Sequence, residues 1–482
     1  MTIQVLSETV NLKEYTVFTG KPDVNSDTIG DLHGNALKLV FFLLHEGVCS
    51  LSAEQYERLV KIYYTKCNIL NARLLAQFDE IIASMTILNH RTLARLMGDD
   101  VAERGSNDYF TLTILTKLRQ HKVPVEILLS NHNLGFIEAN ESKNRLKYKR
   151  LPNGQASSLD NLQHLIDRKL VTRARVAEMV DNAYKPMVKA LSYSLDPAKN
   201  SITIYSHAPI DIKVIYFLAK KLQVPFADNT SLELASTIGN INRRFAAHLR
   251  DNTTSTLYDR NQIGKKDALK AATANNPIEM LTWNRNYDII DRKPIHKKYA
   301  VNYVHGHDPD GPSEGNLCNL DNTLGKGRSM HQGKYDVIRS NDVTAVQAAQ
   351  YIFQAQLDVL AIKMLQLQQR QQMQAYVAAE TLYNGLKKSA DIYFLGEQNK
   401  ENYLTFKGEC YGYIKASRQE LEKHRGWKNI INNLCLAIIG VGVIYLGVSV
   451  AIGHFPFFAT NSAQAVDKLI EHINSLEPMS GA

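Results

Sequence analysis

The chain has 482 residues, of which 44% are hydrophobic and 22% are charged, and its formal net charge is +8. This length exceeds the usual size of a single hydrophobic core, so we expect two or three structural units. The five cysteines form no Cys-x-x-Cys pair, which argues against a disulfide framework. The modest positive charge comes without interleaved aromatic residues or a reading motif, so we expect no nucleic-acid partner.

Five polar segments lie along the chain, and the last four each follow a strand-like apolar run, namely Leu93–Met97, Val125–Leu129, Ile202–Tyr205 and Tyr299–Val304. In the first, Ile29-Gly30-Asp31-Leu32-His33-Gly34-Asn35, an Asp and a His stand two residues apart on a glycine turn and can point at one cation. Open sheets collect their ligands at the carboxyl ends of strands, so we expect all five segments to meet there. The other four are Gly98–Gly105, Ser130–Asn133, Tyr205–His207 and His305–Pro309.

Helical periodicity fills the intervals between these segments. Apolar residues recur at helical spacing in an insertion at about 50–95, between the first two segments. Polar helical stretches at about 140–200 and 212–277 are expected to cap the ligand edge of the sheet, where such elements often select substrates. Residues 1–335 are thus predicted to form one catalytic domain with helical insertions.

The region after residue 335 has a different composition. No proline occurs between Pro312 and Pro456, and residues 342–388 are rich in Gln, Ala and Leu. This pattern predicts one or two long helices within a helical region at 336–428. Such helices usually belong to a bundle or coiled coil, which makes 342–388 a candidate for self-association.

Residues 429–482 form a hydrophobic tail, in which 434–453 carry no charge. Twenty residues at a rise of about 1.5 Å span about 30 Å, the thickness of the bilayer's hydrocarbon core. We therefore expect a membrane helix at 434–453, with a buried hydrophobic hairpin as the alternative. Basic residues just before it place the catalytic domain on the cytosolic side: Lys423, Arg425 and Lys428.

The five segments together resemble the calcineurin-like metallophosphoesterases of the phosphoprotein phosphatase type. Their motifs G-D-x-H-G, G-D-x-x-D-R-G, G-N-H-E/D, a His after a strand and a late G-H appear here in the same order, over roughly residues 20–330. The resemblance implies an α/β fold, a β-sandwich flanked by helices, with a mostly helical C-terminal region. It also implies hydrolysis of phosphoserine or phosphothreonine by a hydroxide that bridges two metal ions.

The expected metal ligands mix carboxylate, amide and imidazole groups, a set that suits manganese, with iron or zinc as alternatives. His305 competes with His307 as the last ligand, although only His307 follows the glycine. The resemblance assigns Asp31 and His33 to the first ion, Asp99 as the bridge, and Asn131, His207 and His307 to the second ion.

Two arginines are expected to clamp the phosphate. The resemblance assigns Arg104 to this role, because a guanidinium can hold two phosphate oxygens at once and stays charged. Trp283-Asn284-Arg285 is similar to the W-x-R element of bacterial relatives, so Arg285 is the second candidate. Arg243 and Arg244 lie in the same interval and stay open as alternatives, while Asn131 is expected to contact the substrate as well as a metal.

His132 is expected to protonate the leaving oxygen, with an acidic partner that fixes its tautomer. In the family this partner is the Asp of D-R-G, and here Glu103 stands in its place, in a loop one residue longer than in protein phosphatase 1. Ser130 and Asn133 also depart from G-N-H-E/D. The groups that do the chemistry, Asn131 and His132, are intact, which favours an active enzyme.

The altered D-R-G loop, the helical insertions and the hydrophobic tail resemble the Wip phosphatase effectors that Legionella injects into host cells by type IV secretion. This implies a host phosphoprotein as substrate and a location on a host organelle membrane. Three alternatives stay open: a phosphotyrosine phosphatase of the same fold, a hydrolase of small phosphoesters or nucleotides, and an inactive module that binds phosphoproteins.

Overall fold

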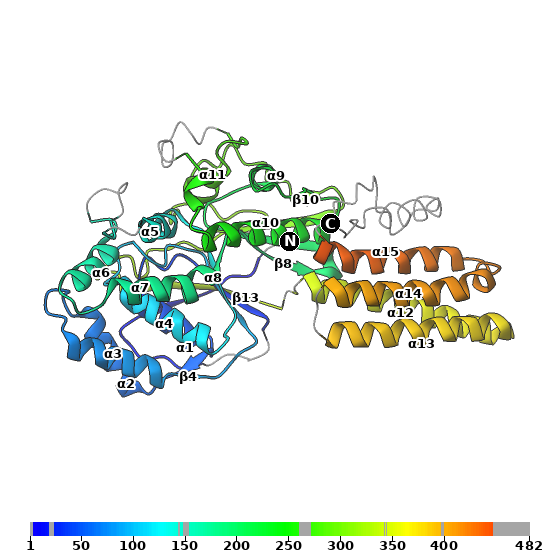
Figure 1. Cartoon of the computed structure of the whole chain (residues 1–482), viewed down its shortest axis with the longest axis horizontal. Helices are drawn as coiled ribbons and strands as arrows, with labels where there is room; N and C mark the ends of the chain where they lie inside the picture. Colours follow the sequence, from blue (N-terminus) through cyan, green and yellow to red (C-terminus); the bar gives the residue numbers. More distant parts are fainter. Residues whose placement is uncertain are drawn as a thin grey trace, which may run out of the picture.

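A computed structural model describes residues 3–18, 24–142, 145–147, 154–259, 271–341, 343, 345–396 and 400–446. It contains a mixed α/β part and a C-terminal bundle of long helices, which extends to one side of it (Figure 1). The first sheet has six strands in the order β1-β13-β2-β5-β6-β7. Their bounds are β1 Leu6–Asn11, β2 Ser26–Ile29, β5 Leu93–Leu96, β6 Val125–Leu128, β7 Val188–Lys189 and β13 Gln332–Ser340.

The second sheet has five strands, with β10-β11-β9-β8 in order and β12 paired to β11. Buried residues from both sheets, including Met97, Tyr205 and Ile338, form a common apolar layer, so the two sheets make a sandwich as predicted. The guanidinium of Arg95 crosses this layer, 3.9 Å from the centre of the Tyr205 ring. The bounds are β8 Ser192–Asp196, β9 Ser201–Ser206, β10 Ile295–His296, β11 Tyr299–His305 and β12 Leu317–Asn319, with a separate pair β3 Cys49–Ser50 and β4 Thr86–Ile87.

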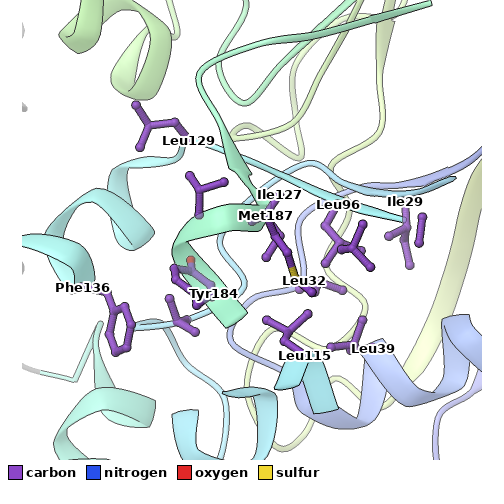
Figure 2. Close-up of a cluster of buried hydrophobic side chains, with 14 of the residues drawn as sticks. Ile29, Leu32, Leu39, Leu96, Leu115, Ile127, Leu129, Phe136, Tyr184 and Met187 are labelled. Carbon is purple, nitrogen blue, oxygen red and sulfur yellow. The ribbon is translucent and has the colours of Figure 1, made fainter. Parts of the chain in front are cut away.

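Helices cover the other face of the first sheet. Ile29, Leu96 and Ile127 from β2, β5 and β6 pack against Leu39 and Leu115 from two of these helices, α1 and α4 (Figure 2). Other helices, among them α10, pack against strands of the second sheet. The helices of the α/β part are α1 Ala36–His45, α2 Ala53–Tyr64, α3 Ala72–Ser84, α4 Asp108–Gln120, α5 Asn131–Glu141, α6 Ser157–Asp167, α7 Arg173–Met179, α8 Lys185–Met187, α9 Ile212–Lys221, α10 Ser231–Arg250 and α11 Pro277–Trp283, with a π-helix Val180–Tyr184 and 3₁₀ turns Pro197–Lys199 and Thr254–Thr256.

The predicted insertions differ in how purely helical they are. The interval 50–95 contains α2 and α3, and 212–277 contains α9 and α10. The interval 140–200 holds strands β7 and β8 besides its helices, because its later part supplies an edge strand to each sheet. The boundary predicted at residue 335 falls inside β13, whose antiparallel pairing with both β1 and β2 keeps 336–340 in the sheet.

The C-terminal helices form a four-helix bundle. Each helix packs against the next, and the first also packs against the last, around a separate core that includes Phe353, Leu386 and Trp427. Self-association through 342–388 stays a prediction. The bounds are α12 Ala345–Gln369, α13 Met373–Leu395, α14 Lys400–Leu421 and α15 Trp427–Leu446.

The predicted membrane helix at 434–453 is not supported over its described part, residues 434–446. Leu434, Ile438 and Val441 lie in α15 and are buried in the bundle core, because a helical bundle can shield an uncharged apolar run as a lipid bilayer would. Residues 447–453 lie outside the described residues. Across the part of the chain that is described, no helix combines enough length and apolar character to cross a membrane.

Truncation of a buried leucine in α15 tests this packing. Leu434→Ala should lower the free energy of unfolding by about 2–5 kcal/mol, since Leu434 is fully buried and its loss leaves a cavity. Leu395→Ala is the matched control, because this leucine is 85% exposed and should change stability by less than about 0.5 kcal/mol. Chemical denaturation followed by circular dichroism measures both variants, and equal effects would contradict the buried position of Leu434.

A buried aspartate in β2 gives the fold a pH dependence. Burial and nearby Glu46 raise the pKa of Asp27 to about 8, although Arg339 acts in the opposite direction. The folded pKa lies above the unfolded value of 3.8, so Asp27 increasingly destabilises the fold as pH rises from about 4 to 8. Asp27→Asn should therefore raise the free energy of unfolding at pH 8.5 by on the order of 3 kcal/mol and leave it unchanged near pH 4. Urea denaturation at both pH values tests this, and a gain that is the same at both would contradict it.

Candidate metal centre

The five polar segments meet at one edge of the sandwich. Strands β2, β5 and β6 run parallel in the first sheet, and β9 and β11 run parallel in the second. Each segment begins where its strand ends, so their side chains converge as the strand-end rule predicts. The predicted residues collected here are Asp31, His33, Asp99, Glu103, Arg104, Asn131, His132, His207, Arg285 and His307.

Local backbone geometry brings the segments close together. A Cβ added to Gly306 would lie 1.9 Å from Asp31 Oδ1, so a glycine is required before His307. Asp99 and His307 themselves adopt left-handed conformations, with φ of 49° and 72°. Non-glycine residues held at positive φ often mark functional sites, where surrounding contacts stabilise the strain.

The departures from G-N-H-E/D have a structural role. Ser130 caps α5, and its hydroxyl accepts hydrogen bonds from the backbone N–H of Asn133 (3.1 Å) and of Asp99 (3.0 Å). The Asn133 side chain accepts from the Ser130 N–H at 2.7 Å, which completes a capping box. These two residues therefore fix the position of Asn131 and His132 relative to Asp99.

The first group of potential ligands comprises Asp99, His207 and His307. His207 Nε2 lies 3.0 Å from Asn131 Oδ1, 3.1 Å from His307 Nδ1 and 3.5 Å from Asp99 Oδ1. His207 Nδ1 donates to the Met97 carbonyl at 3.0 Å, because a carbonyl oxygen can only accept. In a neutral His207 ring, Nε2 would then carry a lone pair that faces Asn131 Oδ1 and Asp99 Oδ1. Lone pairs repel one another, so this arrangement needs a proton or a cation between Nε2 and these oxygens.

The second group comprises Asp99, Glu103 and His132. Asp99 belongs to both groups, which suits the predicted bridging role. His132 Nδ1 donates to the Ala102 carbonyl at 2.6 Å. Glu103, the residue expected to orient His132, instead directs its carboxylate to His33 Nδ1 (3.1 Å) and to Arg104.

Asp31 lies beside the first group. Its Oδ2 accepts from the His307 N–H at 3.0 Å, and its Oδ1 is 3.6 Å from His207 Nδ1. Burial raises the pKa of Asp31 to about 6, with a further contribution from Asp321. Burial would also raise the pKa of Asp99, but His132, His207 and His307 outweigh it and hold that pKa below its ordinary value.

His33 contacts the second group through Glu103, whose carboxylate lies 3.1 Å from His33 Nδ1. Its Nε2 lies 2.7 Å from the Asn322 carbonyl and 3.4 Å from Asp321 Oδ1. Burial lowers the pKa of His33, but Glu103 and Asp321 outweigh this and raise it to about 10. The structure thus does not bring His33 together with Asp31 as a ready ligand pair.

Asp321, which was not among the expected site residues, also lies beside the site. Its side chain is buried, and its Oδ1 lies 3.4 Å from His33 Nε2. The sequence offered one signal, an acidic residue two positions after the short strand β12, which pairs with β11. His305 has its Nδ1 2.9 Å from the Gly306 carbonyl, outside both ligand groups, and burial lowers its pKa to about 4.

Two arginines border the cluster. The Arg104 side chain is 33% exposed, and Arg285 is exposed, so both can meet a ligand that arrives from solvent. Arg285 donates from Nε and Nη2 to the His307 carbonyl, at 3.3 and 3.2 Å. Arg243, an alternative to Arg285, contacts Asn240 within α10.

The buried polar atoms of the cluster fit cation binding. Within the described part of the chain, Asp31 Oδ1, Asp99 Oδ1 and His307 Nε2 are buried and lack hydrogen-bond partners. Unsatisfied buried polar atoms are rare in folded proteins, and an unplaced ion is one explanation for them. Carboxylate, amide and imidazole donors together suit a transition metal such as manganese, iron or zinc.

The two-sheet sandwich and its buried cluster of carboxylates and imidazoles define an α/β phosphatase domain. A family model described as the WipA-like phosphatase domain matches residues 93–326. A solved structure of the phosphatase domain from the Legionella effector WipB matches with 32% sequence identity and a TM-score of 0.55, over 58% of this chain and 98% of that chain. The chain therefore belongs to the WipA-like phosphatase family, which confirms the resemblance noted from its motifs. No curated protein matched it.

Proposed function

We propose that the chain is a dimetal-dependent phosphoprotein phosphatase that hydrolyses phosphoserine and phosphothreonine. The observation that carries this proposal is the convergence on His207 Nε2 of Asn131 Oδ1, His307 Nδ1 and Asp99 Oδ1. When bound, divalent ions neutralise phosphate charge and activate water at neutral pH.

We assign the two ions to Asp99, which both groups share, and to residues around it. Asp99, Asn131, His207 and His307 would hold one ion, and Asp31 with Asp99 would hold the other. His33 would join Asp31 in place of its present bonds to Glu103 and Asp321. The unpartnered oxygens of Asp31 and Asp99 support this assignment.

The remaining residues bind the phosphate and move a proton. Arg104 and Arg285 would hold phosphate oxygens at the solvent side of the cluster, where both are accessible. His132 would donate the proton on Nε2 to the leaving oxygen as the P–O bond breaks, while Nδ1 stays bonded to the Ala102 carbonyl.

The expected substrate is a phosphoprotein of a host cell. Support comes from the solved relative, which is the phosphatase domain of the Legionella effector WipB. We propose that this chain is likewise an effector, delivered into the host cytosol. An association with a host organelle membrane stays a prediction.

A panel of phosphopeptides tests the proposal. Peptides identical except for phosphoserine, phosphothreonine or phosphotyrosine are incubated with the full chain, after metal removal and after manganese is restored. We expect manganese-dependent release of phosphate from the first two peptides. Preference for phosphotyrosine would replace the substrate assignment, faster turnover of nucleotides would favour a small-phosphoester hydrolase, and bound metal without any turnover would favour an inactive binding module.

A further inference from the structure

The loop between β5 and α4 holds a strained backbone next to His132. Ala102 has a φ of 54°, the left-handed region, and is fully buried. This conformation is unfavourable for a residue with a Cβ, so contacts around Ala102 must hold it in place.

Both polar groups of the Ala102 backbone are used. Its N–H donates to the two carboxylate oxygens of Asp108, at 3.1 and 3.0 Å, and its carbonyl accepts from His132 Nδ1 at 2.6 Å. Asp108 is the first residue of α4 and is fully buried. The carboxylate therefore fixes the peptide plane whose oxygen orients the imidazole.

A second buried residue holds the same loop from α6. The hydroxyl of Ser158 accepts from the Glu103 N–H at 3.0 Å and hydrogen-bonds the Asp108 carboxylate. The Ser158 N–H donates to the Glu103 carbonyl at 2.9 Å. Asp108 and Ser158 thus form one bonded unit behind the loop.

The Glu103 carboxylate hydrogen-bonds to residues other than His132. It bonds to His33 Nδ1 at 3.1 Å and to the Arg104 guanidinium, so it holds these two residues. In this loop the acidic side chain is directed to His33 and Arg104, and a backbone carbonyl meets the imidazole. A carbonyl fixes the His132 tautomer as a carboxylate would, because it also accepts only from N–H.

We infer that Asp108, supported by Ser158, is the positioning residue for His132, through the Ala102 carbonyl. The inference rests on the proposed function, since it needs His132 to donate a proton. Proton donation matters most for a leaving group that departs poorly as an anion. Loss of Asp108 should then slow esters of basic alcohols more than esters of acidic phenols.

The test compares phenyl phosphate with p-nitrophenyl phosphate, using the full chain loaded with manganese. Asp108→Ala should lower kcat for phenyl phosphate about 10–100-fold and for p-nitrophenyl phosphate less than about 5-fold, because a nitrophenolate leaves without a proton. KM should change little. Asp108→Asn should restore most of the loss, because its amide oxygen still accepts the Ala102 N–H.

Two further variants guard against a purely structural effect. Ser158→Ala should also lower kcat for phenyl phosphate more than kcat for p-nitrophenyl phosphate, but by a smaller factor than Asp108→Ala does. It serves as the test if Asp108→Ala does not fold. Asp108→Ala added to His132→Ala should cause no further loss, since both act through one proton.

Equal losses on the two esters, or a full additional loss in the His132→Ala background, would overturn the inference. An unchanged kcat in both Asp108→Ala and Ser158→Ala would do the same. A wild-type chain that hydrolyses neither ester would instead contradict the proposed function itself.

Discussion

Asp99→Ala should lower kcat/KM for a phosphoserine peptide by about 10³-fold or more, the largest loss expected from one substitution. Asp99 is assigned to both proposed ions, so its removal weakens both positions, and it is the residue common to the two groups of potential ligands. Ions of this kind contribute several kcal/mol to the stabilisation of transition-state charge, and each 1.36 kcal/mol corresponds to about tenfold in rate. Steady-state kinetics, together with the metal content of the purified variant, measure the effect.

Asp27→Asn is the matched control for this experiment. Asp27 is also a buried aspartate of the first sheet, but it lies in β2 and in neither ligand group. Its substitution should change stability with pH and leave the turnover per folded molecule unchanged. If Asp99→Ala stays folded and keeps more than about a tenth of wild-type turnover, the bridging role is wrong.

His132→Ala should lower kcat for phenyl phosphate by about 10²–10⁴-fold, the usual contribution of a general acid. Its effect on p-nitrophenyl phosphate should be much smaller, because that leaving group needs no proton. Metal content should stay at the wild-type level, in contrast to Asp99→Ala.

The metal measurement also decides between two roles for His132. This residue lies within reach of Asp99 and Glu103, so the geometry allows it to be a ligand as well as an acid. Loss of metal in His132→Ala, with equal losses on both esters, would make His132 a ligand and remove it as the proton donor. His132→Gln offers a second variant of similar volume for the same comparison.

The location of the site could be predicted from the sequence because it follows from a rule of topology. Strands of four to seven residues, most of them rich in apolar side chains, end in polar turns. The carboxyl ends of β2, β5 and β6 in one sheet and of β9 and β11 in the other share one edge. Asp31, Asp99 and His207 therefore meet although they are distant in the sequence. The order of the motifs also identified the family that the solved relative confirms.

The side-chain directions could not be predicted in the same way. The direction of the His33 ring depends on the left-handed backbone of His33 itself, with φ of 56°. It also depends on a contact with Asp321, which comes from a segment far along the chain. His132 Nδ1 donates to the backbone carbonyl of Ala102. Every residue has a backbone carbonyl, so the sequence could not identify this acceptor. Hydrogen bonds within the loop between β5 and α4 bring that carbonyl to the imidazole.

The apolar run at the C-terminus shows a different limit. Hydropathy reports that a helix avoids water, but it does not tell whether lipid or other helices surround it. Leu434 and Ile438 belong to the bundle core, in which α15 packs against α12 and α14, and a Cβ added at Gly440 would lie 3.7 Å from Leu232 of α10. The described part of the run, residues 434–446, therefore packs in a helical bundle, an arrangement that hydropathy could not distinguish from a membrane anchor.

The central claim is that Asp99 joins two cation positions at the edge of the sandwich. Anomalous diffraction from crystals of the manganese-loaded chain tests it most directly. The account predicts one peak among Asp99, Asn131, His207 and His307, and a second beside Asp31 and Asp99, about 3.5–4 Å from the first. Peaks elsewhere in the molecule, or none in a chain that still hydrolyses phosphopeptides, would contradict it.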